Sequence, residues 1–391
     1  MDYNFSPDDI AFRQEVSAFV EQELPKGWDD VHDVRESHEL YQAQQDFKKK
    51  LAAKNWFAMA WPTEYGGQSA SIFRQMIFSE VTARYGAPAG GQGVAWVGPA
   101  ILIYGTDEQK KNYLPKITSA EIDFCTLYTE PGAGSDLAAL QTSAVRDGDE
   151  YVINGHKVFN GGADLADYGW LAARTDPDLP KHRGISLFVV DMKTPGITIR
   201  PMTTMADTDF LQEVYFEDVR IPAASLVGEE NRGWYQMAVS LDFERSGVGK
   251  VSQAERVLQE LVSYAKTTTR KGSPLSEDPS VRSRLNEMAI EVEVSRYLSY
   301  HVASLQDRAV PFSHQASVAK VYGTELLLRV YNVGLKVMGL YGQLSKNSKD
   351  APFNGRYAFE YLNAWGGMFG AGTSEIQRTI IATRGLGLPR D

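Results

Sequence analysis

The sequence predicts an α+β protein built from a helical domain, a β domain and a C-terminal helical bundle, in that order. The first observation behind this prediction is the spacing of apolar residues. It is helical near both ends of the chain, whereas short β-rich runs alternate with turn clusters in the middle. The second is the length of 391 residues, which is too great for one small domain. We place the domains at residues 1–120, 121–232 and 233–391.

Helices fill the predicted N-terminal domain. The first is expected to begin at Ser6, because Pro7 takes the first helical position and acidic residues occupy the first turn. Apolar residues then recur at helical spacing, so one face of this helix is buried. After a loop at residues 61–67, a second helical stretch opens near Ser71 and a third near Thr106, which is a good N-cap.

Strands fill the predicted middle domain. The clearest β-rich runs are residues 151–153, 169–173, 185–190 and 213–216. Asn154-Gly155 follows the first run and predicts a β-hairpin turn, because both residues tolerate a positive φ.

Helical periodicity returns near Gly233 and continues to about Ala382. Residues 284–294, for example, place apolar side chains on one face of a helix and Glu and Arg on the other. Such segments predict long helices that pack together as a bundle.

The residue counts disfavour several classes of function. The 40 basic and 50 acidic residues give a net charge of -10, which disfavours binding to nucleic acid or to an anionic membrane. The first residues show no cationic segment followed by an apolar run, and no stretch of about 18 apolar residues occurs later. We therefore expect a cytoplasmic protein, and the single Cys125 fits a reducing bacterial cytoplasm.

Metal and acyl-transfer chemistry lack a sequence signal as well. The six histidines show no metal-ligand spacing, and one cysteine cannot form an intramolecular disulfide or a thiolate metal cluster. No Gly-x-Ser-x-Gly motif is present to suggest acyl transfer. We expect no metal site.

A glycine-rich segment at residues 127–136 is the most informative part of the chain. Its glycines let the backbone approach a ligand closely, and Thr129 and Ser135 offer hydroxyl groups beside free amides. This combination suits flavin heteroatoms and phosphate oxygens. Glycine spacing alone favours an ordinary glycine-rich turn, because isolated glycine patterns are a weak signal.

The segment Thr129-Glu130-Pro131-Gly132-Ala133-Gly134-Ser135-Asp136 resembles the signature of the acyl-CoA dehydrogenase family. Further segments that resemble this family follow in the family's order: Asn154-Gly155-x-Lys157, residues 172–176, 216–222 and 228–233, Glu244-Arg245, and residues 371–378. The resemblance implies a middle β-barrel-like domain and a C-terminal four-helix bundle. It also implies FAD held between those two domains, commonly in a tetramer whose neighbouring subunits complete the adenine end of the site.

The resemblance also implies which residues contact FAD. These are Tyr128, Thr129, Gly134, Ser135, Phe159, Gly161, Arg270, Gly339, Thr373 and Glu375. Phe159 and Gly161 depart from the family, which usually has Trp and then Thr or Ser there. A phenyl ring can still stack on a flavin, whereas glycine offers an amide but no hydroxyl.

The family removes an α-proton and a β-hydrogen from an acyl-CoA thioester, and an electron-transferring flavoprotein commonly reoxidises the flavin. Most members carry the catalytic base as a Glu before Gly-Thr, where this chain has Ala371. A branch that includes isovaleryl-CoA dehydrogenase instead has Glu in an Asp-Leu-Glu-Arg string. Residues 241–245, Leu-Asp-Phe-Glu-Arg, resemble that string and indicate Glu244 as the base. A solvated helix carboxylate is the alternative role for Glu244.

Hydrogen bonds to the thioester oxygen make the α-proton acidic enough to remove. The resemblance implies that the Ala371 backbone amide donates one of them, because backbone chemistry survives loss of the side chain. It also implies substrate contacts at Ser135, Asp242 and Arg245. The Arg245 guanidinium suits phosphate or pantetheine, and an ion pair with Asp242 is its alternative role.

The segments that would reach a neighbouring subunit's FAD depart further from the family. Residues 270–274 lack the usual Thr-Phe-Gly, and residues 336–340 have Lys in place of Gln and Leu in place of Gly. Only Arg270 keeps its likeness, as a partner for the flavin pyrophosphate. Such departures resemble steroid side-chain dehydrogenases, which are α2β2 heterotetramers of related subunits. Both a homotetramer and an α2β2 heterotetramer stay open.

Three functions follow from these patterns. The leading one is an acyl-CoA dehydrogenase for a branched, cyclic or otherwise bulky acyl group. The second is a subunit whose role is assembly or completion of a flavin site, and such a subunit has no need for Glu244. The third is an acyl-CoA dehydrogenase-like flavin monooxygenase, which has no use for an α-proton base.

Overall fold

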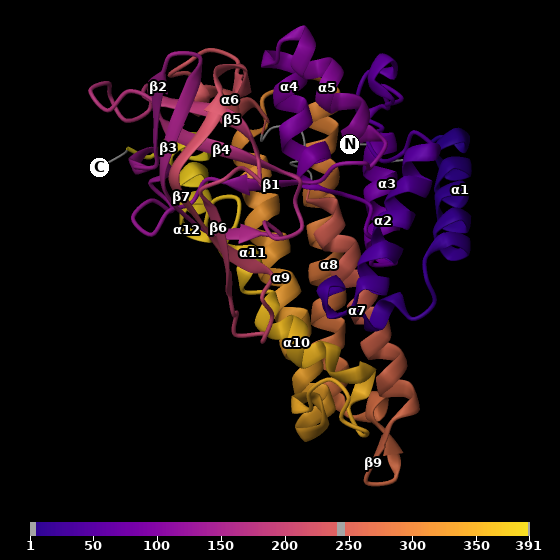
Figure 1. Cartoon of the computed structure of the whole chain (residues 1–391). Helices are drawn as coiled ribbons and strands as arrows, with labels where there is room; N and C mark the ends of the chain where they lie inside the picture. Colours follow the sequence, from indigo (N-terminus) through magenta and orange to yellow (C-terminus); the bar gives the residue numbers. More distant parts are fainter. Residues whose placement is uncertain (1–4, 241–246, 390–391) are drawn as a thin grey trace. The chain divides into compact units, whose positions relative to one another are not determined.

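The computed structural model describes residues 5–240 and 247–389, and Figure 1 labels most of its helices and strands. The backbone divides into two compact units. The first, here called the helical unit, holds residues 1–47, 70–89 and 245–391, and the second, the sheet unit, holds residues 48–69 and 90–244. The division falls inside α2 (His38–Ala53). The domain borders near residues 120 and 232 stay a prediction.

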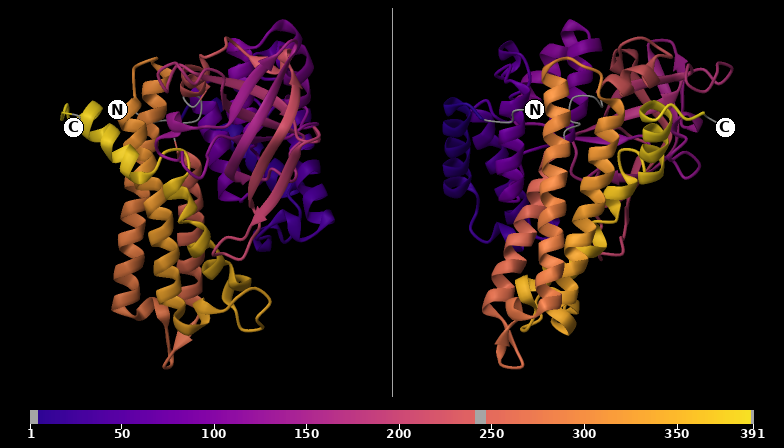
Figure 2. Two further views of the ribbon diagram at one scale, coloured as in Figure 1. Left: turned by 60° about the vertical axis from the view of Figure 1, so that its left-hand side comes forward. Right: turned by 180° about the vertical axis from the view of Figure 1, so that it is seen from behind.

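The helical unit is built around long helices. It contains α1 (Pro7–Glu23), α3 (Ile72–Arg84), α7 (Val248–Thr267), α8 (Pro279–Asp307), α9 (Ser313–Met338), α10 (Arg356–Asn363), α11 (Gly366–Phe369) and α12 (Ser374–Ile380). A short hairpin of β9 (Thr269–Arg270) and β10 (Ser273–Pro274) joins α7 to the segment before α8. Both views in Figure 2 show α7, α8 and α9 side by side, as the predicted bundle requires.

Local capping explains where the first helices begin. The Ser6 hydroxyl accepts from the Asp9 amide at 3.1 Å, and the Asp9 carboxylate accepts from the Ser6 amide at 3.1 Å, which completes a capping box. The Ser71 hydroxyl caps α3 by accepting from the Arg74 amide, and Thr106 forms a second capping box at the start of α5 (Asp107–Thr118). The helix starts predicted at Ser6, Ser71 and Thr106 are therefore confirmed.

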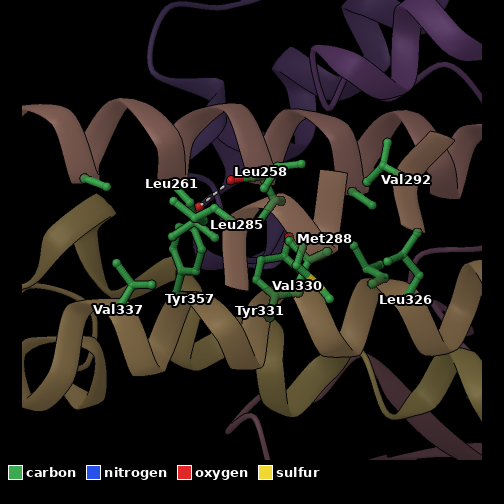
Figure 3. Close-up of a cluster of buried hydrophobic side chains, with 14 of the residues drawn as sticks. Leu258, Leu261, Leu285, Met288, Val292, Leu326, Val330, Tyr331, Val337 and Tyr357 are labelled. Carbon is green, nitrogen blue, oxygen red and sulfur yellow. Dashed lines mark hydrogen bonds between the residues drawn. The ribbon is translucent and has the colours of Figure 1, made fainter. Parts of the chain in front are cut away.

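Apolar side chains from several helices form the core of the helical unit. Leu261, Leu285 and Tyr331 are buried there, and Figure 3 shows them within one cluster between the helices. The Tyr357 hydroxyl, also buried, donates to the Val257 carbonyl at 3.0 Å, so its polar atom is satisfied. Each fully buried aliphatic or aromatic side chain contributes roughly 1.5–3 kcal/mol to stability.

Among its described residues, the sheet unit holds one eight-stranded sheet, the C-terminal part of α2 and three further α-helices. The strands are β1 (Phe124–Leu127), β2 (Ser143–Asp147), β3 (Glu150–Gly161), β4 (Tyr168–Arg174), β5 (Ile185–Asp191), β6 (Ile197–Met202), β7 (Leu211–Pro222) and β8 (Leu226–Val227). They pair in the order β6-β7-β3-β2-β4-β5-β8, and β1 joins parallel to β4. The helices are α4 (Gly98–Tyr104), α5 and α6 (Gly233–Ser240).

Both faces of β4 and β5 are covered. Trp170 and Leu187 pack with residues of α4 and α5, whereas the alternate residues Leu171 and Phe188 pack with Tyr151 of β3 and with apolar residues of β7. The sheet therefore curls so that distant strands share one core, which agrees with a barrel-like domain. The chain is thus α+β, with helices, then strands, then helices, as the sequence predicts.

The predicted hairpin turn at Asn154-Gly155 is wrong. Both residues lie inside β3, at a shift in register with β7, and the turn between β2 and β3 is at Gly148, whose φ is +65°. The Asn154 side chain is held within the sheet, because its amide donates to the Asp218 carboxylate at 3.0 Å and its oxygen accepts from the Asp218 amide at 2.9 Å. Asn-Gly here marks a β-bulge, which glycine also favours.

No helix among the described residues has both the length and the apolar character needed to cross a membrane. Within residues 5–240 and 247–389, no group of three or more His, Cys, Asp or Glu side chains is placed to hold a metal ion.

Candidate active site

The glycine-rich loop follows β1 in the sheet unit. Glu130 and Ala133 exchange two backbone hydrogen bonds of 3.1 and 3.0 Å, which closes a tight turn and leaves Gly134 and Ser135 exposed beyond it. A Cβ built on Gly134 would meet no atom within 4 Å. Within the described chain, neither the Gly134 amide nor the Ser135 amide donates to another group. The loop thus offers open backbone donors.

The start of this loop is fixed to the neighbouring strand. The Thr129 carbonyl accepts from the Val158 amide of β3 at 2.8 Å, and the Tyr128 carbonyl accepts from Lys157 Nζ at 3.0 Å. The Tyr128 ring packs against the core that the sheet shares with α4 and α5, and burial raises the pKa of its hydroxyl. Tyr128 and Thr129 therefore have little freedom to move relative to β3.

Phe159 projects from a bulge in β3. Its φ is +59°, the register with β7 shifts between Lys157 and Asn160, and 58% of the Phe159 side chain is exposed. A left-handed φ at a non-glycine residue is strained, so the bulge holds the phenyl ring in a position that an ordinary strand would not give it. An exposed ring of this kind is available to stack on a ligand.

Gly161 ends the same strand, with a neighbour that the sequence did not indicate. A Cβ built on Gly161 would lie 2.8 Å from two ring carbons of Phe210, so the phenyl group fills the space that a Thr or Ser side chain would need. Phe210 is itself 53% exposed. The Phe210 ring therefore lies where the hydroxyl-bearing side chain of other family members would be. No sequence motif indicated Phe210.

A second cluster lies in the helical unit, at the turn between α11 and α12. Ala371 has a φ of +53° and Gly372 a φ of +85°, and Thr373 caps α12 by accepting from the Ile376 amide at 3.2 Å. The Ala371 carbonyl accepts from Gln377 Nε2 at 3.2 Å, and its amide donates to no other group among the described residues. The turn thus leaves the Ala371 amide open.

Lys320 of α9 holds this turn in place. Its ammonium donates to the Gly372 carbonyl at 2.8 Å and to the Met368 carbonyl at 3.4 Å. The pKa of the Lys320 amine is lowered, because the effect of partial burial outweighs the opposing effect of the nearby Glu325 and Glu375 carboxylates. Glu375 is exposed in the first turn of α12. No sequence motif indicated Lys320, because its contacts are to backbone atoms far along the chain.

Arg270 and Gly339 also lie together in the helical unit. The Arg270 guanidinium donates to the Val337 carbonyl at 2.9 Å, and a Cβ on Gly339 would be 3.6 Å from its Nη2 atom. Gly339 has a φ of +66° and ends α9. The next residue, Leu340, is 87% exposed. The structure thus joins these two predicted positions, with an apolar side chain beside them.

Three of the predicted residues cannot be placed. Asp242, Glu244 and Arg245 lie outside the described residues. Their assigned roles therefore stay predictions, as do those of the other site residues.

Comparison with known proteins identifies the family. Residues 6–121 match the acyl-CoA dehydrogenase N-terminal domain, residues 125–219 the middle domain and residues 231–386 the C-terminal domain. The chain belongs to the acyl-CoA dehydrogenase family. It is 37% identical over 398 residues to acyl-CoA dehydrogenase FadE26 of Mycobacterium tuberculosis (strain ATCC 25618 / H37Rv), and the match covers 100% of this chain and 99% of that protein.

Solved structures of the family share the fold of this dehydrogenase. The ChsE4-ChsE5 complex from Mycobacterium tuberculosis contains a chain that is 36% identical, with a TM-score of 0.91 and 100% of both chains covered. A chain of the Tcur3481-Tcur3483 steroid ACAD is 34% identical, with a TM-score of 0.89 and the same coverage. Both are complexes of two named proteins.

Family membership makes this protein an oxidoreductase, and FAD is the cofactor of the family. The described residues fit that group. The loop at Gly134 and Ser135 offers open amides for heteroatoms or phosphate oxygens, and Phe159 offers an exposed ring face. The features that suit a flavin therefore include backbone groups as well as side chains.

Proposed function

We propose that this protein catalyses the α,β-dehydrogenation of an acyl-CoA thioester to the trans-2-enoyl-CoA, with Glu244 as the base. The observation that carries the proposal is the turn at Ala371. Its residues offer an open backbone amide but no carboxylate where the family commonly has one, so a base must come from another position. Glu244 is the carboxylate that the sequence pattern supplies.

The chemical requirement is to make a weakly acidic proton removable. A carboxylate can take the α-proton only if the negative charge that develops on the thioester oxygen is stabilised. The Ala371 amide would donate to that oxygen, and exclusion of water would raise the basicity of Glu244. Bound FAD supplies the hydride acceptor for the β-hydrogen.

The remaining predicted residues would bind and orient the two ligands. Tyr128, Thr129, Gly134, Ser135, Phe159 and Gly161 of the sheet unit, and Arg270, Gly339, Thr373 and Glu375 of the helical unit, would hold FAD. Ser135, Asp242 and Arg245 would contact the substrate, where the Arg245 guanidinium suits phosphate or pantetheine. An electron-transferring flavoprotein would reoxidise the flavin, and a branched, cyclic or bulky acyl group is the proposed substrate class.

A specific observation favours a second candidate, a subunit of an α2β2 assembly. The solved relatives include two complexes of two named proteins, one of them a steroid ACAD. Leu340 projects an 87% exposed apolar side chain beside Arg270 and Gly339, at a position where the family commonly has glycine. A partner with a related but different surface would suit that position better than an identical copy.

One experiment separates these functions. The purified chain is assayed for flavin content, and then for anaerobic bleaching of the flavin and formation of 2-enoyl-CoA with straight, branched and cyclic acyl-CoAs. If a partner is needed, we expect at most about one FAD for every two chains, and we expect bulky acyl-CoAs to bleach the flavin. A homotetramer with one FAD per chain would contradict the α2β2 candidate. Bound flavin that no acyl-CoA bleaches would contradict the dehydrogenase.

A further inference from the structure

A charged pair is buried beneath the glycine-rich loop. Lys157 of β3 has no exposed surface and Glu130 is 8% exposed, and Lys157 Nζ lies 2.8 Å from Glu130 Oε1. The same ammonium donates to the Tyr128 carbonyl at 3.0 Å. One lysine thus holds the last residue before Thr129 and the first residue of the turn. Lysine is rarely buried so completely unless it is paired.

Glu130 holds the other end of the loop. Its two carboxylate oxygens accept from the backbone amides of Gln141 at 2.6 Å and Thr142 at 2.9 Å. The pair therefore connects three segments that are separate in the sequence. They are the end of β1, the residues before β2, and β3. Between its two attachment points, the loop carries the open amides of Gly134 and Ser135.

Stability alone is a poor reason for such a pair. Removing two charges from water is costly, and an apolar pair of the same shape is often as stable or more stable. A buried charged pair does fix geometry, because each group has few alternative partners once water is excluded. Its position beneath the exposed part of the loop is where fixed geometry would matter for a ligand.

We propose that Lys157 and Glu130 are positioning residues that fix the loop of residues 129–142 for FAD, so that FAD affinity depends on the charge of Lys157. This inference rests on the proposed contacts of Gly134 and Ser135 with FAD. Neither side chain touches the flavin itself. They act through the backbone that they hold.

The pair gives the affinity a predicted pH dependence. Burial lowers the pKa of Lys157 to about 8, the Glu130 carboxylate opposes this shift, and the Arg174 guanidinium adds slightly to it. The Lys157 charge is therefore present below pH 8 and is lost as pH rises above 8. Glu130 then loses the ammonium that it faces. We expect FAD to bind more weakly at pH 9 than at pH 7.

The test uses the protein in the oligomeric form that binds FAD, and it measures FAD affinity and melting temperature separately. Lys157→Met keeps most of the side-chain length but leaves Glu130 without its counter-charge. The double variant, which adds Glu130→Gln, leaves neither member of the pair charged. We expect both to weaken FAD binding by roughly tenfold to a hundredfold. The double variant should regain melting temperature relative to the single one, which separates positioning from stability.

The loop offers a matched control. Lys181 pairs with Asp136 of the same loop at 2.7 Å, but both side chains are more than half exposed. Lys181→Met should change FAD affinity by less than about twofold. A double variant that binds FAD as tightly as the wild type would overturn the proposal, as would a wild-type affinity that is unchanged between pH 7 and pH 9. The second measurement requires no variant to fold.

These outcomes are distinguishable from failure of the proposed reaction. FAD affinity is measured without acyl-CoA, so it does not depend on Glu244. If the affinity follows Lys157 but no acyl-CoA bleaches the flavin, the positioning role stands and the dehydrogenase proposal fails.

Discussion

Gly155 lies where β3 passes Thr142, at the end of the loop of residues 129–142, and it has no room for a side chain. A Cβ there would be 2.3 Å from Thr142 Oγ1 and 2.7 Å from Thr142 Cα. The backbone of Thr142 has little freedom to yield, because its amide donates to the buried Glu130 carboxylate. One missing methyl group therefore allows the loop and the strand to pack together.

Gly155→Ala is expected to destabilise the protein by about 2–3 kcal/mol, because the added methyl group would overlap a fixed backbone. Chemical denaturation of the FAD-free protein measures the change. Gly132→Ala is the matched control in the same loop, because a Cβ there would meet no atom within 4 Å. Equal stability of the two variants would show that the loop can move away from β3.

At this scale the sequence identifies residue types better than their surroundings. The positions of Ser135, Phe159 and Ala371 follow from family motifs, yet the left-handed φ values of Phe159 and Ala371 do not. Asn154-Gly155 is a residue pair that both turns and β-bulges favour, so the pair alone does not tell a turn from a bulge. Only the contacts of Asn154 with Asp218 show that it forms a bulge here. Those contacts join residues that are 64 positions apart.

Among the elements, helix α3 carries a buried carboxylate that joins it to two other helices. Glu80 is 3% exposed, accepts from the Tyr300 hydroxyl at 2.7 Å and forms an ion pair with Arg13 of α1. Arg296 of α8 lies 3.7 Å away and also pairs with Glu255 of α7. Burial and the Glu80 carboxylate raise the pKa of Tyr300. This network sets how the helices of the helical unit pack.

Glu80→Ala should destabilise the protein by about 3–5 kcal/mol, because the buried Tyr300 and the partly buried Arg296 and Arg13 would lose the carboxylate that they face. Thermal or chemical unfolding checks this. Glu293→Ala removes another partner of Arg296, but Glu293 is 57% exposed, so we expect a change below about 1 kcal/mol. A similar small effect for both variants would mean that the network contributes little to packing.

Helix starts could be predicted because capping is local: Ser6, Ser71 and Thr106 each act on amides within three residues. The Glu80 network could not, because Tyr300 is 220 positions away in sequence. The same reason explains why Lys320 and Phe210 were not expected at the candidate site. Neither belongs to a local pattern, and each is recognised only by what it touches.

On the scale of the whole molecule, the ordered motifs and the three matched domains lead to the same family. The order of helices, strands and helices follows from hydrophobic periodicity alone. The proposed α2β2 partner does not follow from this periodicity, because the proposed assembly would use exposed side chains, for which Leu340 is a candidate, rather than buried patterns. Asp242, Glu244 and Arg245 lie outside the described residues. The proposal that Glu244 is the base therefore depends on its sequence motif and on the absence of a carboxylate at Ala371.

The most direct test of that base is the rate at which a bulky acyl-CoA bleaches the flavin anaerobically in Glu244→Gln. We expect the rate to fall by at least about a hundredfold with FAD content unchanged, because general-base catalysis contributes roughly 10²–10⁴. Glu217→Gln, a change at an exposed carboxylate of β7, should leave the rate unchanged. Bleaching by Glu244→Gln at the wild-type rate would contradict the assignment of Glu244.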